Sequence, residues 1–144
     1  MLILGSWEQQ EDGIERPILR GEVAAPDGSW VGVPFLVDTG ADRTVISAPY
    51  YAALVPAGVE PTDSLVGIGG VCRAVILTTT IQLYTADVRP MPFRGQFRVF
   101  AEPDASEMSV LGRDILNLFA VVVDHGGRKV CLVRDRHRCV ILEG

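Results

Sequence analysis

The chain has 144 residues, a length that suits a single domain (1–144) with a sizeable core and leaves no room for two. Its residues are 48% hydrophobic, with 15 glycines and 9 prolines, which favours a compact fold with many turns over disorder. The formal net charge of −5 disfavours nucleic-acid binding, which requires a basic surface. With three cysteines lacking C-x-x-C spacing and two histidines, we expect neither a disulfide framework nor a metal site.

The apolar segments give no sign of export or membrane insertion. The N-terminal run M-L-I-L is too short for a signal sequence and has no basic residues before it. No window approaches the roughly 18 apolar residues that a membrane span requires. We therefore expect a cytoplasmic protein with reduced thiols and no membrane partner.

In chain order, the first elements are strands and turns. Residues 17–23 and 30–37 are apolar segments separated by A-P-D-G-S, a strong turn sequence, and they predict a hairpin. A short strand is expected at 45–46. A short helix is expected over 50–54, because Ser47 suits the N-cap and a proline follows in the first turn.

The second half of the chain again favours strands. Val75, Leu77, Ile81 and Leu83 are two or four residues apart, the period of a strand with one buried face. Further strands are expected at 96–101, 120–123 and 129–133, with a polar loop at 102–107 and a short helix after Gly112. The pattern predicts a mainly β domain with one or two short helices.

The candidate chemistry is concentrated in V-P-F-L-V-D-T-G-A-D-R-T-V-I-S, residues 33–47. An apolar strand leads directly into the carboxylate of Asp38, and apolar surroundings favour the protonated form of an acid. Gly40 allows the backbone to turn sharply beside it. Asp-Thr-Gly is also ordinary turn sequence, so a simple β-turn is the alternative. The apolar strand and the second carboxylate, Asp42, favour a functional site.

Two further motifs bear on this site. The segment L-V-G-I-G-G-V, residues 65–71, predicts a hairpin tip whose backbone can meet a ligand, or else a plain glycine-rich turn. It lacks the Lys-Ser/Thr of a phosphate loop. In S-V-L-G-R-D-I-L, residues 109–116, Arg113 lies beside apolar residues and calls for a carboxylate partner. Asp42 is the natural candidate, and a solvated arginine at the helix start is the alternative.

D-T-G-A-D-R-T, G-I-G-G and L-G-R-D, in this order, resemble the motifs of the retropepsin family. These are the dimeric aspartic proteases of retroviruses and their stand-alone bacterial and eukaryotic relatives. The resemblance covers about residues 17–133 and implies a closed, β-barrel-like acid-protease fold. It implies that Asp38 is the catalytic aspartate and that Thr39 hydrogen-bonds across the dimer axis. Gly40 would accept the substrate main chain, and Ala41 would lie beside the carboxylate.

The resemblance also assigns supporting and substrate-binding residues. Asp42 and Arg113 would form a buried ion pair that braces the site. The flap that closes over the peptide would have its tip at Gly67, Ile68, Gly69 and Gly70. Side-chain pockets would be lined by Leu36, Val45, Val110 and Leu111. The stretch between the flap and Gly112 is longer than in the viral enzymes, so elaborated outer loops are expected around 84–108.

The number of motifs bears on assembly. Aspartic-protease chemistry needs two carboxylates that share one proton, and the chain has one segment of this kind. A homodimer is therefore expected, acting on a peptide or protein substrate without metal or cofactor. The alternative is a catalytically silent retropepsin-like module for dimerisation or peptide binding. A small β-barrel with a carbohydrate or nucleotide ligand has no aromatic platform or basic patch in its favour.

Overall fold

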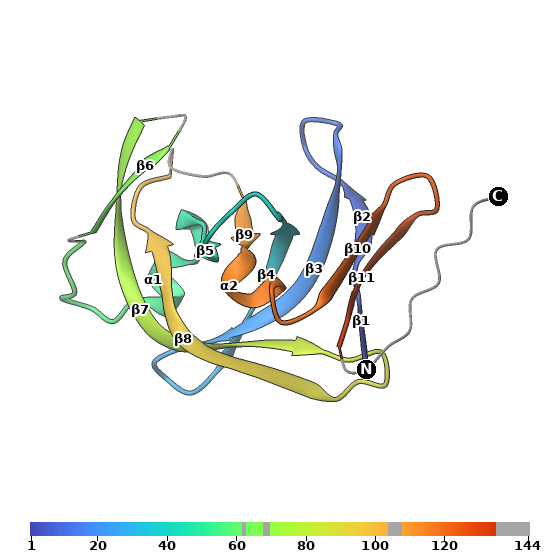
Figure 1. The fold of residues 1–144 in the computed structure, drawn as a ribbon. Helices are drawn as coiled ribbons and strands as arrows, with labels where there is room; N and C mark the ends of the chain where they lie inside the picture. Colours follow the sequence, from blue (N-terminus) through green and yellow to red (C-terminus); the bar gives the residue numbers. More distant parts are fainter. Residues whose placement is uncertain (62, 68–69, 104–107, 135–144) are drawn as a thin grey trace.

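A computed structural model describes residues 1–134 apart from 62, 68–69 and 104–107. The described chain is mainly strand, as predicted, with short helical segments between strands (Figure 1). The strands are β1 (Leu2–Leu4), β2 (Ser6–Gln9), β3 (Glu15–Ala24), β4 (Trp30–Val37), β5 (Val45–Ile46), β6 (Asp63–Gly67), β7 (Gly70–Tyr84), β8 (Pro90–Phe100), β9 (Ser109–Leu111), β10 (Ala120–Asp124) and β11 (Lys129–Val133). The helical segments are η1 (Ala48–Tyr50), α1 (Tyr51–Leu54) and α2 (Arg113–Leu116). In the described part of the chain, no helix is long and apolar enough to cross a membrane.

The larger sheet closes on itself. Its strands follow the order β2-β3-β4-β9-β5-β8-β7-β6, and β3 also pairs with β7, with Glu22 opposite Gln82 and Val23 opposite Ile81. Strands β3, β4, β9, β5, β8 and β7 therefore form a continuous ring of pairings around the core. This is the barrel-like arrangement that the sequence motifs imply.

The β3–β4 hairpin forms where the sequence predicts it. Its turn has Gly28 at φ +86°, a conformation that glycine adopts without steric penalty, and the N–H of Gly28 donates to the carbonyl of Ala25 at 3.0 Å. The side chain of Asp27 accepts the N–H of Ser29 at 2.9 Å. Alternate residues of β4 then face inward and are buried: Val33, Phe35 and Val37. Asp38 follows directly.

A smaller sheet of order β1-β11-β10 packs its inner face against the same core. Strands β10 and β11 form the predicted hairpin, whereas β1 was not expected. Its residue Ile3 lies opposite Leu132 of β11, and both side chains are buried. Likewise β2 pairs with β3, so ordered structure begins well before the first strand signal in the sequence.

The expectation of elaborated outer loops at 84–108 is wrong over its first part. Strands β7 and β8 instead form a long hairpin, in which the N–H of Thr85 donates to the carbonyl of Arg89 at the turn. Strand β8 begins at Pro90, six residues before the predicted start at Gln96. Pro90 and Pro92 obscured this strand, because proline cannot donate to a sheet. Proline is tolerated here because this end of β8 has a partner strand on one edge only among the described residues.

The predicted short helix after β5 is present, but the side-chain cap at its start is not. Ser47 precedes η1 and makes no side-chain capping bond. Its hydroxyl lies 3.0 Å from that of Ser109 in β9, and both residues are almost fully buried. A buried hydroxyl requires a partner, and the tertiary contact supplies one in place of the local cap.

Candidate active site

Asp38 lies where β4 ends, at the start of a loop that leads to β5 (Figure 1). The N–H of Asp38 donates to the carbonyl of Leu111 at 3.2 Å, which extends the pairing of β4 with β9 by one residue. Its carboxylate oxygen Oδ1 accepts the N–H of Gly40 at 2.9 Å. Asp38 is half-buried, whereas Thr39 and Gly40 are exposed. A strand whose inward face is buried therefore presents this carboxylate beside two accessible residues.

The opposite side of the loop is attached to the start of α2. The N–H of Arg113 donates to the carbonyl of Ala41 at 2.8 Å. Before it, Gly112 lies so close to the loop that a Cβ built on it would come within 2.9 Å of the nitrogen of Arg43 and closer still to its carbonyl group. Backbone contacts thus join the D-T-G-A-D-R-T and L-G-R-D motifs, which are distant in sequence.

Thr44 and Asp114 complete this connection, and neither residue was expected from the sequence to do so. The backbone N–H of Thr44 donates to the Asp114 carboxylate at 3.0 Å, and its hydroxyl donates at 2.7 Å. The same hydroxyl accepts the N–H of Gly112 at 3.0 Å. Thr44 is 1% exposed, so its polar groups need partners within the protein. The sequence feature that could have indicated this contact is the acidic residue directly after the arginine of L-G-R-D.

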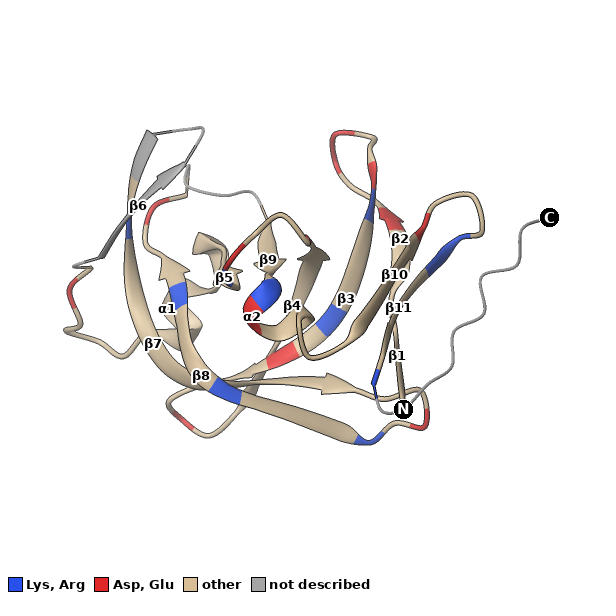
Figure 2. Ribbon diagram, in the orientation of Figure 1, with Lys and Arg blue, Asp and Glu red and all other residues tan. Residues whose placement is uncertain are grey.

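Asp42 and Arg113 form the expected ion pair, between Arg113 Nη2 and Asp42 Oδ1. Opposite charges lie side by side on α2 and the neighbouring loop in Figure 2. The expected burial is absent, because the side chains of Arg113 and Asp42 are 47% and 78% exposed. An exposed pair adds little to the stability of the folded chain.

Three of the four predicted pocket residues lie together. Strands β4 and β9 run parallel with Leu36 opposite Val110, and β5 places Val45 opposite Val110 on the other side. All three side chains are half-buried, so part of each surface is available to a ligand. Leu111 is fully buried in the core, which is inconsistent with a pocket-lining position.

The glycine-rich segment lies in the β6–β7 hairpin. Gly67 and Gly70 end the two strands and pair with each other. Ile68 and Gly69, the other two residues predicted for the flap tip, lie outside the described residues. The hairpin extends from the barrel at one side of the molecule in Figure 1.

Within the described ranges, no group of three or more His, Cys, Asp and Glu side chains is placed to hold a metal ion. The arrangement instead offers one carboxylate, an exposed Thr-Gly backbone next to it and a half-buried aliphatic surface. A water-activating site of the two-carboxylate kind would need a second carboxylate beside this one.

Comparisons with known proteins bear on the family and the fold. The family model described as retroviral aspartyl protease matches residues 15–124. The crystal structure of a retropepsin-like aspartic protease from Rickettsia conorii is similar in fold, with a TM-score of 0.57 and 18% identity, covering 92% of this chain and 88% of that chain. EIAV protease, solved in complex with the inhibitor HBY-793, gives a TM-score of 0.45 and 25% identity, with 71% of this chain and 86% of that chain covered. A comparison with curated proteins finds no match. Because the family model spans most of the sequence, this chain belongs to the retroviral aspartyl protease family, with a retropepsin-like fold.

Proposed function

We propose that this protein is an aspartic endopeptidase that works as a homodimer, with Asp38 contributed by each subunit. The observation that carries the proposal is the placement of Asp38. Its carboxylate is presented at the end of a buried strand and held by the Gly40 N–H, in a loop that Leu111 and Arg113 fix through the backbone. One chain supplies one such carboxylate, and a two-fold axis supplies the second.

The proposed reaction follows from two carboxylates that share one proton. The ionised Asp38 takes a proton from a water molecule as its oxygen attacks the carbonyl carbon of the peptide. The protonated Asp38 of the other subunit donates to the carbonyl oxygen, giving a tetrahedral intermediate. The first Asp38 then gives its proton to the amide nitrogen and the C–N bond breaks. A hydroxyl of the intermediate returns a proton to the other Asp38, so that one proton is again shared. Neither a metal nor a covalent intermediate is required.

The surrounding residues have proposed roles in binding. Thr39 would hydrogen-bond across the dimer axis, and Gly40 would contact the substrate main chain. The β6–β7 hairpin would close over an extended peptide as a flap. Because Leu36, Val45 and Val110 are aliphatic, we expect apolar side chains next to the scissile bond.

The decisive variant is Asp38→Asn, assayed on an unstructured protein and on a peptide library. Asparagine cannot take or donate the shared proton, so cleavage should fall by about 100- to 10,000-fold, the range for loss of a general acid–base group. The circular dichroism spectrum should not change. Asp27→Asn, in the turn between β3 and β4, is the control and should retain full activity. Substantial cleavage by Asp38→Asn would refute the catalytic assignment.

The dimer has its own test. Wild type and Asp38→Asn are mixed, allowed to exchange subunits and assayed at constant total protein. If each site needs two intact chains, an equal mixture retains about a quarter of the wild-type activity. Active monomers would retain about half.

A silent binding module is the remaining functional alternative. Such a module can bind a statine-type transition-state mimic without cleaving any peptide. Binding together with cleavage supports the enzyme, whereas binding alone across the whole peptide library supports the module.

A further inference from the structure

The edge of β8 that faces away from β7 is open over residues 93–97. Along its other edge β8 pairs with β7 over its whole length. On the open side it pairs only with β5, at Arg98 and Val99. Within the described residues, the backbone of 93–97 forms hydrogen bonds only within the β7–β8 ladder. Pro90 and Pro92 have no backbone N–H, so the earlier part of this edge has fewer donors. The unpaired backbone N–H and C=O groups of the edge therefore lie mainly after residue 92.

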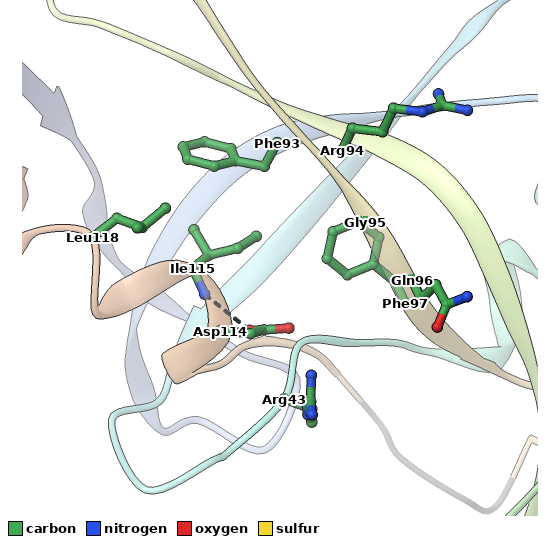
Figure 3. A pocket seen from close by; sticks show the side chains of 9 residues that line it. All are labelled: Arg43, Phe93, Arg94, Gly95, Gln96, Phe97, Asp114, Ile115 and Leu118. Carbon is green, nitrogen blue, oxygen red and sulfur yellow. Dashed lines mark hydrogen bonds between the residues drawn. The ribbon is translucent and has the colours of Figure 1, made fainter.

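A groove of about 220 Å³ runs beside this open edge (Figure 3). Its lining includes five consecutive residues of β8 together with residues of α2, of the segment after it and of the Asp38 loop: Phe93, Arg94, Gly95, Gln96, Phe97, Asp114, Ile115, Leu118 and Arg43. Phe93, Ile115 and Leu118 form its apolar end, whereas Arg43 lies at the other end below Asp114. Leu118 is 48% exposed, so this apolar surface is accessible.

Two arginines and one carboxylate line the groove, and the carboxylate, Asp114, accepts hydrogen bonds from Thr44. Most described arginines pair with a carboxylate: Arg16 with Asp12, Arg20 with Glu8, Arg73 with Glu102, Arg89 with Asp87, Arg113 with Asp42 and Arg128 with Glu15. The side chains of Arg43 and Arg94 have no such partner among the described residues. The oxygens of Asp114 accept the N–H and hydroxyl of Thr44 and are not paired with Arg43. Strand β8 has basic residues along its length and no acidic ones (Figure 2).

We propose that this groove binds an extended acidic peptide segment of a partner protein, which adds a strand to the open edge of β8. Main-chain hydrogen bonds to residues 93–97 would supply affinity, as in other cases of strand addition. An apolar side chain of the peptide would pack against Phe93 and Leu118, and an acidic one would pair with Arg43. Arg94 extends away from α2 and contributes to the attraction at longer range. Binding here does not require Asp38 to be catalytic.

The test uses the Asp38→Asn protein, so that no probe is cleaved. The probe is a fluorescein-labelled nine-residue peptide of alternating leucine and glutamate, and binding is measured by fluorescence anisotropy. Two matched probes carry lysine in place of glutamate, or N-methyl groups on alternate backbone nitrogens. We expect saturable binding of the acidic probe, weaker binding at high salt, and loss of binding for both matched probes.

Variants locate the site. Arg43→Ala should raise the dissociation constant about two- to fivefold, the scale of one exposed ion pair, and Arg94→Ala should raise it less. Leu118→Asp, at an exposed position, should raise it more than either, because it adds repulsion to the loss of apolar contact. Arg89→Ala, in the β7–β8 turn, is the matched control and should bind normally. Unchanged thermal midpoints show that each variant is folded.

Several results would overturn the proposal. Equal binding of the N-methylated probe would exclude strand addition, and equal binding of the lysine probe would exclude recognition of acidic side chains. Displacement by a statine-type inhibitor would place the probe at the proposed active site instead of in this groove. If binding of the acidic probe does not saturate up to about 1 mM protein, its binding free energy is weaker than roughly 4 kcal/mol and the proposed site is rejected.

Discussion

The carboxylate of Asp114 accepts hydrogen bonds from both the backbone N–H and the hydroxyl of Thr44, across 70 residues of chain. The Thr44 hydroxyl in turn accepts the N–H of Gly112, so one buried threonine connects the loop after β4 to the start of α2. The position of Asp38 therefore depends on two motifs that only the folded chain brings together.

Replacing Asp114 tests this connection. Asp114→Ala leaves the N–H and hydroxyl of Thr44 buried without an acceptor, so the free energy of unfolding should fall by about 1–3 kcal/mol, measured in urea. Cleavage should fall as well, because the Asp38 loop loses its anchor. Asp114→Asn keeps a carbonyl acceptor and should lose less on both measures. Unaltered stability of Asp114→Ala would show that the loop is held without this carboxylate.

The Asp42–Arg113 pair should matter more to the dimer than to the subunit. Its exposure in one chain predicts a coupling energy below about 1 kcal/mol for folding of the subunit, measured by a double-mutant cycle with Asp42→Ala and Arg113→Ala. If the partner subunit covers the pair, breaking it from one side costs on the order of 3–5 kcal/mol of association free energy. Sedimentation equilibrium measures that quantity. If a single substitution lowers the association free energy by no more than the coupling energy measured for folding, the pair stays exposed in the dimer.

A pH dependence is expected from Glu15. Hydrogen bonds from Arg128, and then from His125, hold the pKa of the Glu15 carboxyl below its usual value of 4.5. A lowered pKa in the folded state stabilises the protein above 4.5, and this contribution is lost as the pH falls through the folded-state pKa. Arg128→Gln should therefore have a lower thermal midpoint than the wild type at neutral pH. This difference should disappear in more acidic solution. Lys129→Gln, which removes a neighbouring positive charge, is the control. If the difference in thermal midpoint between Arg128→Gln and the wild type is the same at every pH, the assignment to Glu15 is wrong.

Local patterns in the sequence account for much of the barrel. The β3–β4 hairpin was predictable because its turn chemistry and its alternation of buried residues both lie within about twenty-five residues of chain. Strand β1 was not, because its three residues acquire a role only by pairing with β11 at the far end of the sequence. The first half of β8 was hidden by prolines that an unpaired edge tolerates.

The candidate site shows the same division. The position of Asp38 at the end of a strand was predictable because an apolar run leads directly into Asp-Thr-Gly. Thr44 and Asp114 were not, since each is an ordinary polar residue in sequence and their connection exists only through tertiary contact. The exposure of Arg113 was expected only as the alternative, because the apolar residues around it in sequence face the core while its own side chain points to the surface.

Gly112 gives the sharpest test of the packing behind Asp38. Its φ is −98°, which any residue can adopt, so glycine is needed here for space and not for backbone conformation. A Cβ would overlap the backbone of Arg43, which cannot move without shifting the loop between Asp38 and Thr44. We therefore expect Gly112→Ala to lower the free energy of unfolding by about 1–3 kcal/mol and to reduce cleavage. Gly32 in β4 is the matched control, because a Cβ there meets nothing within 4 Å. Gly32→Ala should change the unfolding free energy by no more than about 0.5 kcal/mol and leave cleavage intact. Both variants are compared by urea denaturation and by kcat/KM on one peptide. If Gly112→Ala behaves like Gly32→Ala in both assays, the close contact with Arg43 does not hold the loop in place.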